Sequence, residues 1–145
     1  DFEGGGFGVL NRVNVAANVD TQWTNRTGPY VPSGAVWKPA ITSKAIGNMF
    51  AVANSDFAAP NPKDTQIRTA VLDASAYSDL FLNFRHYFSY YPGEPSQWAY
   101  VEVSTNGGTT FTPVATYTSN QGWAMDFNEV IIDFMFTLFL VCLIS

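Results

Sequence analysis

Apolar and polar residues alternate along positions 80–91. One set of alternating positions is mainly apolar: Leu80, Leu82, Phe84, His86, Phe88 and Tyr90. The intervening set is Phe81, Asn83, Arg85, Tyr87, Ser89 and Tyr91. Because successive side chains of a β-strand point to opposite faces, this period predicts a strand whose first set packs in the core.

A second alternating segment covers residues 98–104. Its expected inward positions are Ala99, Val101 and Val103, and its outward positions are Trp98, Tyr100, Glu102 and Ser104. Asn106-Gly107 follows, a pair that favours the positive φ angles of a type I′ turn. The sequence therefore predicts a hairpin from residues 98–104 to residues 111–117.

Further strands are expected at residues 48–54, 65–72 and 129–134, separated by loops rich in Pro, Gly and Asn. No segment keeps a helical apolar stripe for three turns. Short strands at this spacing predict an all-β fold, a two-layer antiparallel β-sandwich.

The end of the chain differs from the rest, because residues 134–144 form an almost unbroken apolar run. The run is shorter than the roughly 20 residues that a membrane-spanning helix needs, so no membrane span is expected. We divide the chain into a sandwich module, residues 1–134, and an apolar C-terminal segment, residues 135–145. That segment is a closing strand, a strand donated to a neighbouring subunit, or a non-native tail.

Composition narrows the class of protein. With 145 residues the chain suits one domain, and its 13% charged and 47% hydrophobic residues are more typical of extracellular β-sandwiches than of cytosolic enzymes. The seven basic residues are scattered and the net charge is −5, which argues against a nucleic-acid partner. Cys142 is the single cysteine, so no disulfide forms within one chain.

Five segments carry a family resemblance: DFEG at residues 1–4, ANSD at 53–56, TQIRTAVLD at 65–73, LNFRHYF at 82–88 and VEVSTNGGTTF at 101–111. They resemble the secreted jelly-roll modules related to MAM domains and to the cleaved-adhesin domains of bacterial surface proteins. The resemblance implies a jelly-roll-like sandwich in a secreted or cell-surface protein. The polar loop, final strand and acidic pair that usually end such modules are absent here.

The resemblance also implies a structural calcium ion, and Glu3, Asp56 and Asp64 match the positions of its ligands. Calcium takes six to eight oxygen ligands, which these carboxylates and nearby carbonyl groups could supply. The alternative is that the three are ordinary solvated loop acids.

Exposed aromatic residues among polar ones point to a ligand-binding surface. The candidate ligand-binding residues are Asn83, Arg85, Tyr87, Tyr91, Trp98 and Tyr100. Aromatic rings stack on sugars while the polar groups bond to hydroxyls, and the same mixture suits a protein interface. The alternative is a second buried layer of side chains beneath a loop.

Catalytic signals are weak. The sole histidine, His86, alternates in phase with core positions, and no Gly-x-Ser-x-Gly turn is present. Residues 104–111 resemble the Asp-box hairpin of sialidase propellers with Asn106 in place of the acid, but the motif occurs once, which favours a structural turn. We therefore expect no catalytic residue and no enzyme.

The sequence thus favours a non-catalytic extracellular binding or adhesion module that holds a carbohydrate or protein ligand. The alternative is a structural subunit of an extracellular polymer or filament, a homo-oligomer assembled through strand or apolar-tail contacts.

Overall fold

The computed structural model describes residues 8, 10–14, 22–32, 39–44, 46–54, 64–90, 97–135 and 139–144. Within these ranges the regular structure is β-strand apart from one short 3-10 turn, and the strand pairs whose registers are defined are antiparallel. The predicted all-β class is therefore confirmed.

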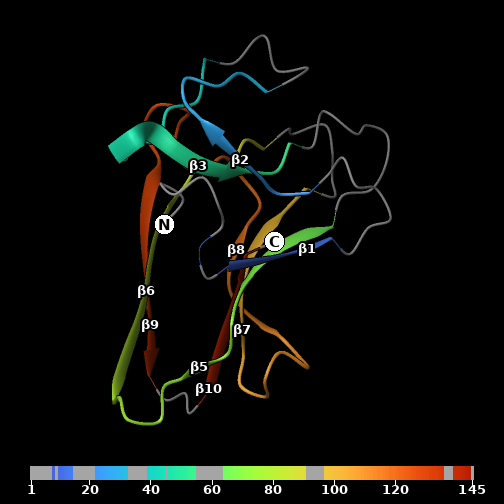
Figure 1. Cartoon of the computed structure of the whole chain (residues 1–145), viewed down its shortest axis with the longest axis vertical. Helices are drawn as coiled ribbons and strands as arrows, with labels where there is room; N and C mark the ends of the chain where they lie inside the picture. Colours follow the sequence, from blue (N-terminus) through green and yellow to red (C-terminus); the bar gives the residue numbers. More distant parts are fainter. Residues whose placement is uncertain are drawn as a thin grey trace. The chain divides into compact units, whose positions relative to one another are not determined.

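The elements follow one another along the chain as Figure 1 labels them. In order they are β1 (Leu10–Asn14), β2 (Thr24–Thr27), η2 (Ile46–Asn48), β3 (Met49–Val52), β4 (Thr65–Thr69), β5 (Leu72–Asp73), β6 (Asp79–His86), β7 (Ala99–Ser104), β8 (Thr112–Tyr117), β9 (Asn128–Met135) and β10 (Phe139–Ile144). The strands predicted at residues 48–54, 65–72, 98–104, 111–117 and 129–134 are all present, with ends shifted by a few residues.

The chain divides into two compact units. The first contains residues 1–67 and 124–126, and the second contains residues 68–123 and 127–145. The apolar C-terminal segment thus belongs to the same unit as the strands before it, and the division after residue 134 follows only the change in composition.

The first unit is built around the antiparallel pair β2–β3, in which Thr24 lies opposite Val52 and Thr27 opposite Met49. Phe50 is buried here, and its ring centroid lies 6.4 Å from that of Tyr30. Because these apolar groups leave water together, they supply the driving force for this pairing.

The second unit is a two-layer antiparallel sandwich (Figure 1). One layer is the pair β6–β9, in register from Asp79 opposite Met135 to His86 opposite Asn128. The other contains β7 between β8 and β10, with β5 paired to β10. The ring centroids of His86 on β6 and Tyr117 on β8 lie 4.5 Å apart, so the inner faces of the two layers are in contact.

The core of this unit is centred on Val101, which is fully buried as predicted. The other expected core residues point inward but are only half-buried: Leu82, Phe84, Phe88 and Val103. Leu82 and Phe84 lie on β6, whereas Phe88 lies beyond the end of that strand at His86. Since β6–β9 contains two strands among the described residues, the inner side chains of β6 lie beside a sheet edge, although Phe134 on the inner face of β9 is buried.

The C-terminal segment forms a strand of its own chain. Val141 of β10 lies opposite Ser104 of β7, and Phe139 lies opposite Asp73 of β5. The three expectations for this segment stay predictions. Among the described residues no helix is long and apolar enough to cross a membrane.

Candidate functional site

An exposed sheet surface in the second unit is the side of β6–β9 that faces away from the core. We call it the outer face, and its exposed members are Asp79, Phe81, Asn83, Arg85, Glu129, Ile131 and Asp133. Exposure alternates strictly along β6, as the sequence pattern predicts. The same alternation that turns Leu82 and Phe84 inward therefore turns this polar and apolar mixture outward.

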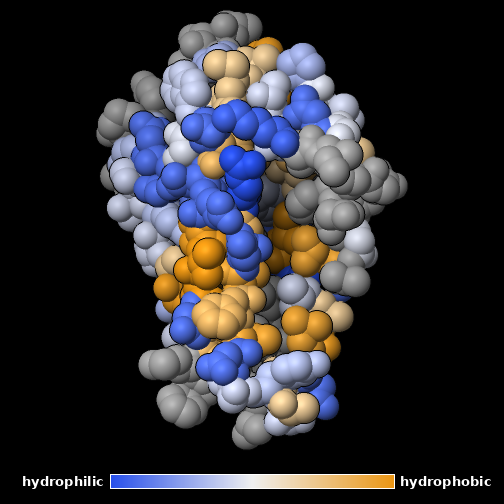
Figure 2. Space-filling model, turned by 90° about the vertical axis from the view of Figure 1, so that its left-hand side faces the viewer, coloured by the Kyte–Doolittle hydropathy of each residue, from blue (hydrophilic) through white to orange (hydrophobic). Residues whose placement is uncertain are grey.

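Two large apolar side chains lie at the centre of the outer face. Phe81 is 58% exposed and Ile131 is 64% exposed. Phe81 lies opposite Asp133 and Asn83 lies opposite Ile131, so the two apolar residues are diagonal neighbours across the strand pair. Figure 2, which looks onto the β6–β9 side, shows hydrophobic residues gathered on this surface with hydrophilic residues beside them.

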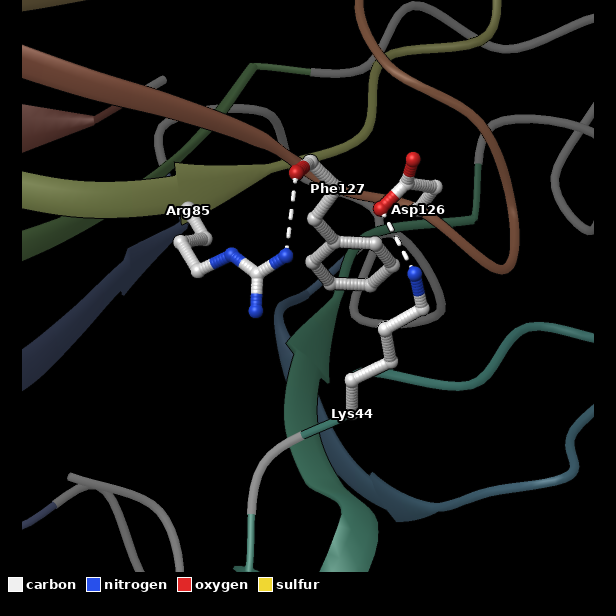
Figure 3. A network of polar contacts seen from close by, with 4 residues as sticks. All are labelled: Lys44, Arg85, Asp126 and Phe127. Atoms are coloured by element: carbon white, nitrogen blue, oxygen red, sulfur yellow. Dashed lines mark hydrogen bonds and ion pairs between the residues drawn. The ribbon is translucent and has the colours of Figure 1, made fainter.

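The polar residues at the other end of the outer face are held in place by hydrogen bonds. Asn83 Nδ2 donates to Glu129 Oε1 at 3.2 Å, and Arg85 Nη2 donates to the carbonyl oxygen of Phe127 at 3.3 Å (Figure 3). Tyr87 packs beside the same residue, with its ring centroid 6.3 Å from that of Phe127. These contacts fix the direction of Asn83 and Arg85 on the outer face.

Figure 3 also shows an ion pair from the first unit, in which Lys44 Nζ lies 2.7 Å from Asp126 Oδ1. Both side chains are more than half exposed, so the pair contributes at most about 1 kcal/mol to stability. Both of its residues belong to the first unit, so the ion pair has no part in the outer face.

The remaining predicted ligand-binding residues lie elsewhere. Trp98 and Tyr100 contact each other edge to face, with ring centroids 6.4 Å apart, on and beside β7. Tyr117, which meets the inner face of β6, lies opposite Ala99, so Tyr100 points to the other side of β7. Tyr91 lies outside the described residues.

The structure therefore divides the five described members of this group between two layers, and their role in binding stays a prediction. Asn83, Arg85 and Tyr87 belong to the β6–β9 layer, whereas Trp98 and Tyr100 belong to the opposite layer. In the structure β6 and β7 belong to different sheets, so their outward side chains point in opposite directions.

Sequence reasoning also missed part of the outer face. It placed Phe81 among the outward residues without giving it a role, and it assigned no face to Ile131. Val130, Ile131 and Ile132 are all apolar, so β9 has no alternation to reveal its exposed side. Only the register with β6 shows that Ile131 faces outward.

The predicted calcium site falls mainly outside the described residues. Glu3 and Asp56 are among the residues not described, and Asp64 is exposed just before β4. Within the described ranges no group of three or more His, Cys, Asp or Glu residues is arranged to hold a metal. Calcium stays a prediction, and the melting temperature with and without a chelator would check it.

The loop that joins β7 to β8 differs from the predicted type I′ turn. The positive φ angles occur at Gly107 and Gly108, at 71° and 85°. Asn106 Oδ1 instead accepts bonds from the backbone N–H groups of Thr109 and Thr110, at 3.1 and 2.9 Å. Two peptide N–H groups that would otherwise need water are thereby bonded within the loop.

Ser104 is buried, although the alternation of β7 places it outward. Its hydroxyl oxygen accepts a bond from the backbone N–H of Gly108 at 2.8 Å and its hydroxyl donates to Asn106 Oδ1 at 2.8 Å. In the pairing with β8 the register shifts between Val101 and Glu102, where β8 carries the extra residue Val114. The loop is thus a bonded corner of the fold, which agrees with its expected structural role.

His86 lies in the sandwich interior, half-buried between aromatic rings. Its ring centroid is 4.5 Å from that of Tyr117 and 5.4 Å from that of Phe84. Nε2 is buried and makes no hydrogen bond within the part of the chain that is described. Burial lowers the pKa of His86 below its ordinary value of 6.5, because removal from water disfavours the charged imidazolium.

Comparison with known proteins adds no assignment: no family model, no curated protein and no solved structure matches the chain.

Proposed function

We propose that this chain is a non-catalytic binding module of a secreted or cell-surface protein, and that it holds a glycan or an extracellular protein on the outer face of β6–β9. The exposure of Phe81 and Ile131 at the centre of a regular strand pair is the observation that carries this proposal. Leaving two large apolar side chains in water gains nothing for the fold, whereas covering each with a ligand is worth roughly 1.5–3 kcal/mol.

The polar neighbours support the same role. Asn83 and Glu129 are bonded to each other, and Arg85 is anchored on the carbonyl of Phe127, so a ligand meets hydrogen-bonding groups that are already oriented. Preorganised polar groups beside an apolar centre are typical of binding surfaces, because less side-chain freedom is lost on binding.

The environment of His86 supports a role without catalysis. The single histidine of the chain points into the sandwich with its Nε2 buried, and its ring contacts are with Phe84 and Tyr117. A general base must reach the proton that it removes, and this nitrogen faces the protein interior.

The polymer alternative has less support than the binding module. It rested on a C-terminal strand donated to a neighbour, and β10 is already paired with β7 and β5 of its own chain.

A binding screen with a matched variant tests the proposal. The chain is applied to arrays of glycans and of extracellular peptides, and its best ligand is then titrated against Phe81→Ser and against Val114→Ser, a change at an exposed apolar residue of β8. We expect Phe81→Ser to weaken binding roughly tenfold and Val114→Ser to leave it within about twofold. Absence of any ligand, or equal effects of the two variants, would overturn the proposal.

A further inference from the structure

The charges around Phe81 narrow the class of ligand. The outer face carries three carboxylates, Asp79, Glu129 and Asp133, against one guanidinium, Arg85. Asp133 lies directly opposite Phe81 across the strand pair, and Asp79 precedes Phe81 by two positions on the same face. Phe81 therefore has two carboxylate residues as neighbours, one along its own strand and one across the strand pair.

Neither carboxylate is neutralised within the described residues. Asp79 Oδ2 accepts a bond from the hydroxyl of Ser78 at 2.8 Å, which leaves its negative charge in place. The ion pair of the described residues, Lys44 with Asp126, belongs to the other unit. The carboxylate of Glu129, by contrast, already accepts from Asn83, and Arg85 lies opposite it. The uncompensated charge is thus at the Phe81 end of the outer face.

An aromatic ring beside two carboxylates is a favourable binding site for a basic side chain. The negative face of a phenyl ring attracts a guanidinium or ammonium group, and flanking carboxylates add to that attraction. The aliphatic stem of Arg or Lys covers the ring while its charged head stays partly hydrated. Ile131, the diagonal neighbour of Phe81, then offers an apolar surface to the next part of the ligand.

We propose that the partner is an extracellular protein segment in which Arg or Lys is flanked by apolar residues, with the basic side chain over Phe81 beside Asp79 and Asp133 and an apolar side chain on Ile131. This inference rests on the proposed function and names the ligand class for the same face. A segment of this kind uses both features at once, the charge and the apolar area. A small organic amine would use only the first.

Charge also disfavours the other occupants. A second copy of this chain would bring the same acidic surface and a net charge of −5 toward itself, and anionic glycans would be repelled in the same way. A neutral glycan would gain nothing from the net charge of the surface, so its binding would not depend on salt.

Arrays of peptides in which one Arg or Lys is flanked by apolar residues provide the probe, with the same peptides carrying Glu as charge-reversed controls. Asp133→Asn removes the charge opposite Phe81, and Asp73→Asn, at an exposed residue of β5, removes an equal charge away from the outer face. Phe81→Leu keeps an apolar side chain and removes the ring. Circular dichroism confirms that each variant is folded.

We expect the basic peptides to bind and the Glu peptides not to bind. Asp133→Asn should weaken binding about threefold, the size expected for one exposed charge pair, while Asp73→Asn changes it less than about 1.5-fold. Raising the salt concentration from about 50 mM to about 500 mM should weaken binding further, and Phe81→Leu should weaken it by a similar factor to Asp133→Asn.

Two results would overturn the inference and leave the proposed function standing: a neutral glycan or Glu peptide bound through Phe81, or binding of basic peptides that Asp133→Asn and Asp73→Asn weaken equally. Loss of all binding from every array, or binding that Phe81→Ser does not change, would overturn the proposed function and the inference with it.

Discussion

The centre of β7 and the outer face of β6–β9 differ in how far their apolar side chains are exposed to water. On β7 Val101 is fully buried, and the loop that follows bonds its own backbone through Ser104 and Asn106. On β6–β9 the inner face ranges from half-buried Phe84 to buried Phe134, while Phe81 and Ile131 on the outer face are more than half exposed. Val101 is thus committed to the fold, whereas Phe81 and Ile131 present apolar area that the fold does not use.

This difference separates residues that stabilise the protein from residues that are available to a ligand. Substitutions in the β7 layer should change the free energy of unfolding, and substitutions on the outer face should change binding instead.

The largest effect on stability is expected at the centre of the core. Val101→Ala removes two buried methyl groups and leaves a cavity, so it should lower the free energy of unfolding by about 2 kcal/mol. Ile131→Ala, on the outer face, should change it by less than about 0.5 kcal/mol. Urea denaturation measures both. Equal losses would show that the two layers are not distinct in this way.

A smaller loss is expected in the loop between β7 and β8. Asn106→Ala removes the acceptor for two backbone N–H groups and should cost about 1–2 kcal/mol in denaturant unfolding. Asn106→Asp keeps an acceptor with a full negative charge and should be at least as stable as the natural chain. Thr105→Ala, an exposed neighbour, serves as the control and should have little effect. A destabilised Asp variant would contradict the bonding described for this loop.

The smallest of these effects is the pH dependence due to His86. Because its folded-state pKa is lowered, the unfolded chain binds the proton more readily, so its contribution to stability is present above about pH 6.5 and is lost as the pH falls toward the folded-state pKa. The other titratable group in contact, Tyr117, stays neutral in this range, since burial raises its pKa.

Unfolding free energies between about pH 7.5 and pH 5 should therefore decline in the natural chain and be flatter in His86→Phe, a ring of similar size. Parallel pH profiles for the two proteins would mean that His86 is not held neutral by its surroundings.

The sequence predicts much of this arrangement, for identifiable reasons. The period of two along β6 depends only on strand geometry, so it correctly separates Phe84 from Arg85. Burial of Val101 follows from the same rule. The position of Ser104 does not follow from it, because its bonds to the loop are set by tertiary structure.

The candidate site was harder to predict than the strands. A pattern along one strand gives its two faces, but it does not say which strands share a sheet. The pairing of β6 with β9, far away in the sequence, brings Ile131 and Asp133 beside Phe81 and separates Tyr100 from Arg85. That pairing forms the outer face, and no local pattern in the chain encodes it.

The most direct test compares the two outward aromatic residues that the sandwich places on opposite layers. The best ligand of the natural chain is titrated against Phe81→Ser and Trp98→Ser; these residues are 58% and 48% exposed. Binding through the outer face of β6–β9 predicts a roughly tenfold loss for Phe81→Ser and a change within about twofold for Trp98→Ser. A tenfold loss for Trp98→Ser with binding by Phe81→Ser unchanged would contradict the account.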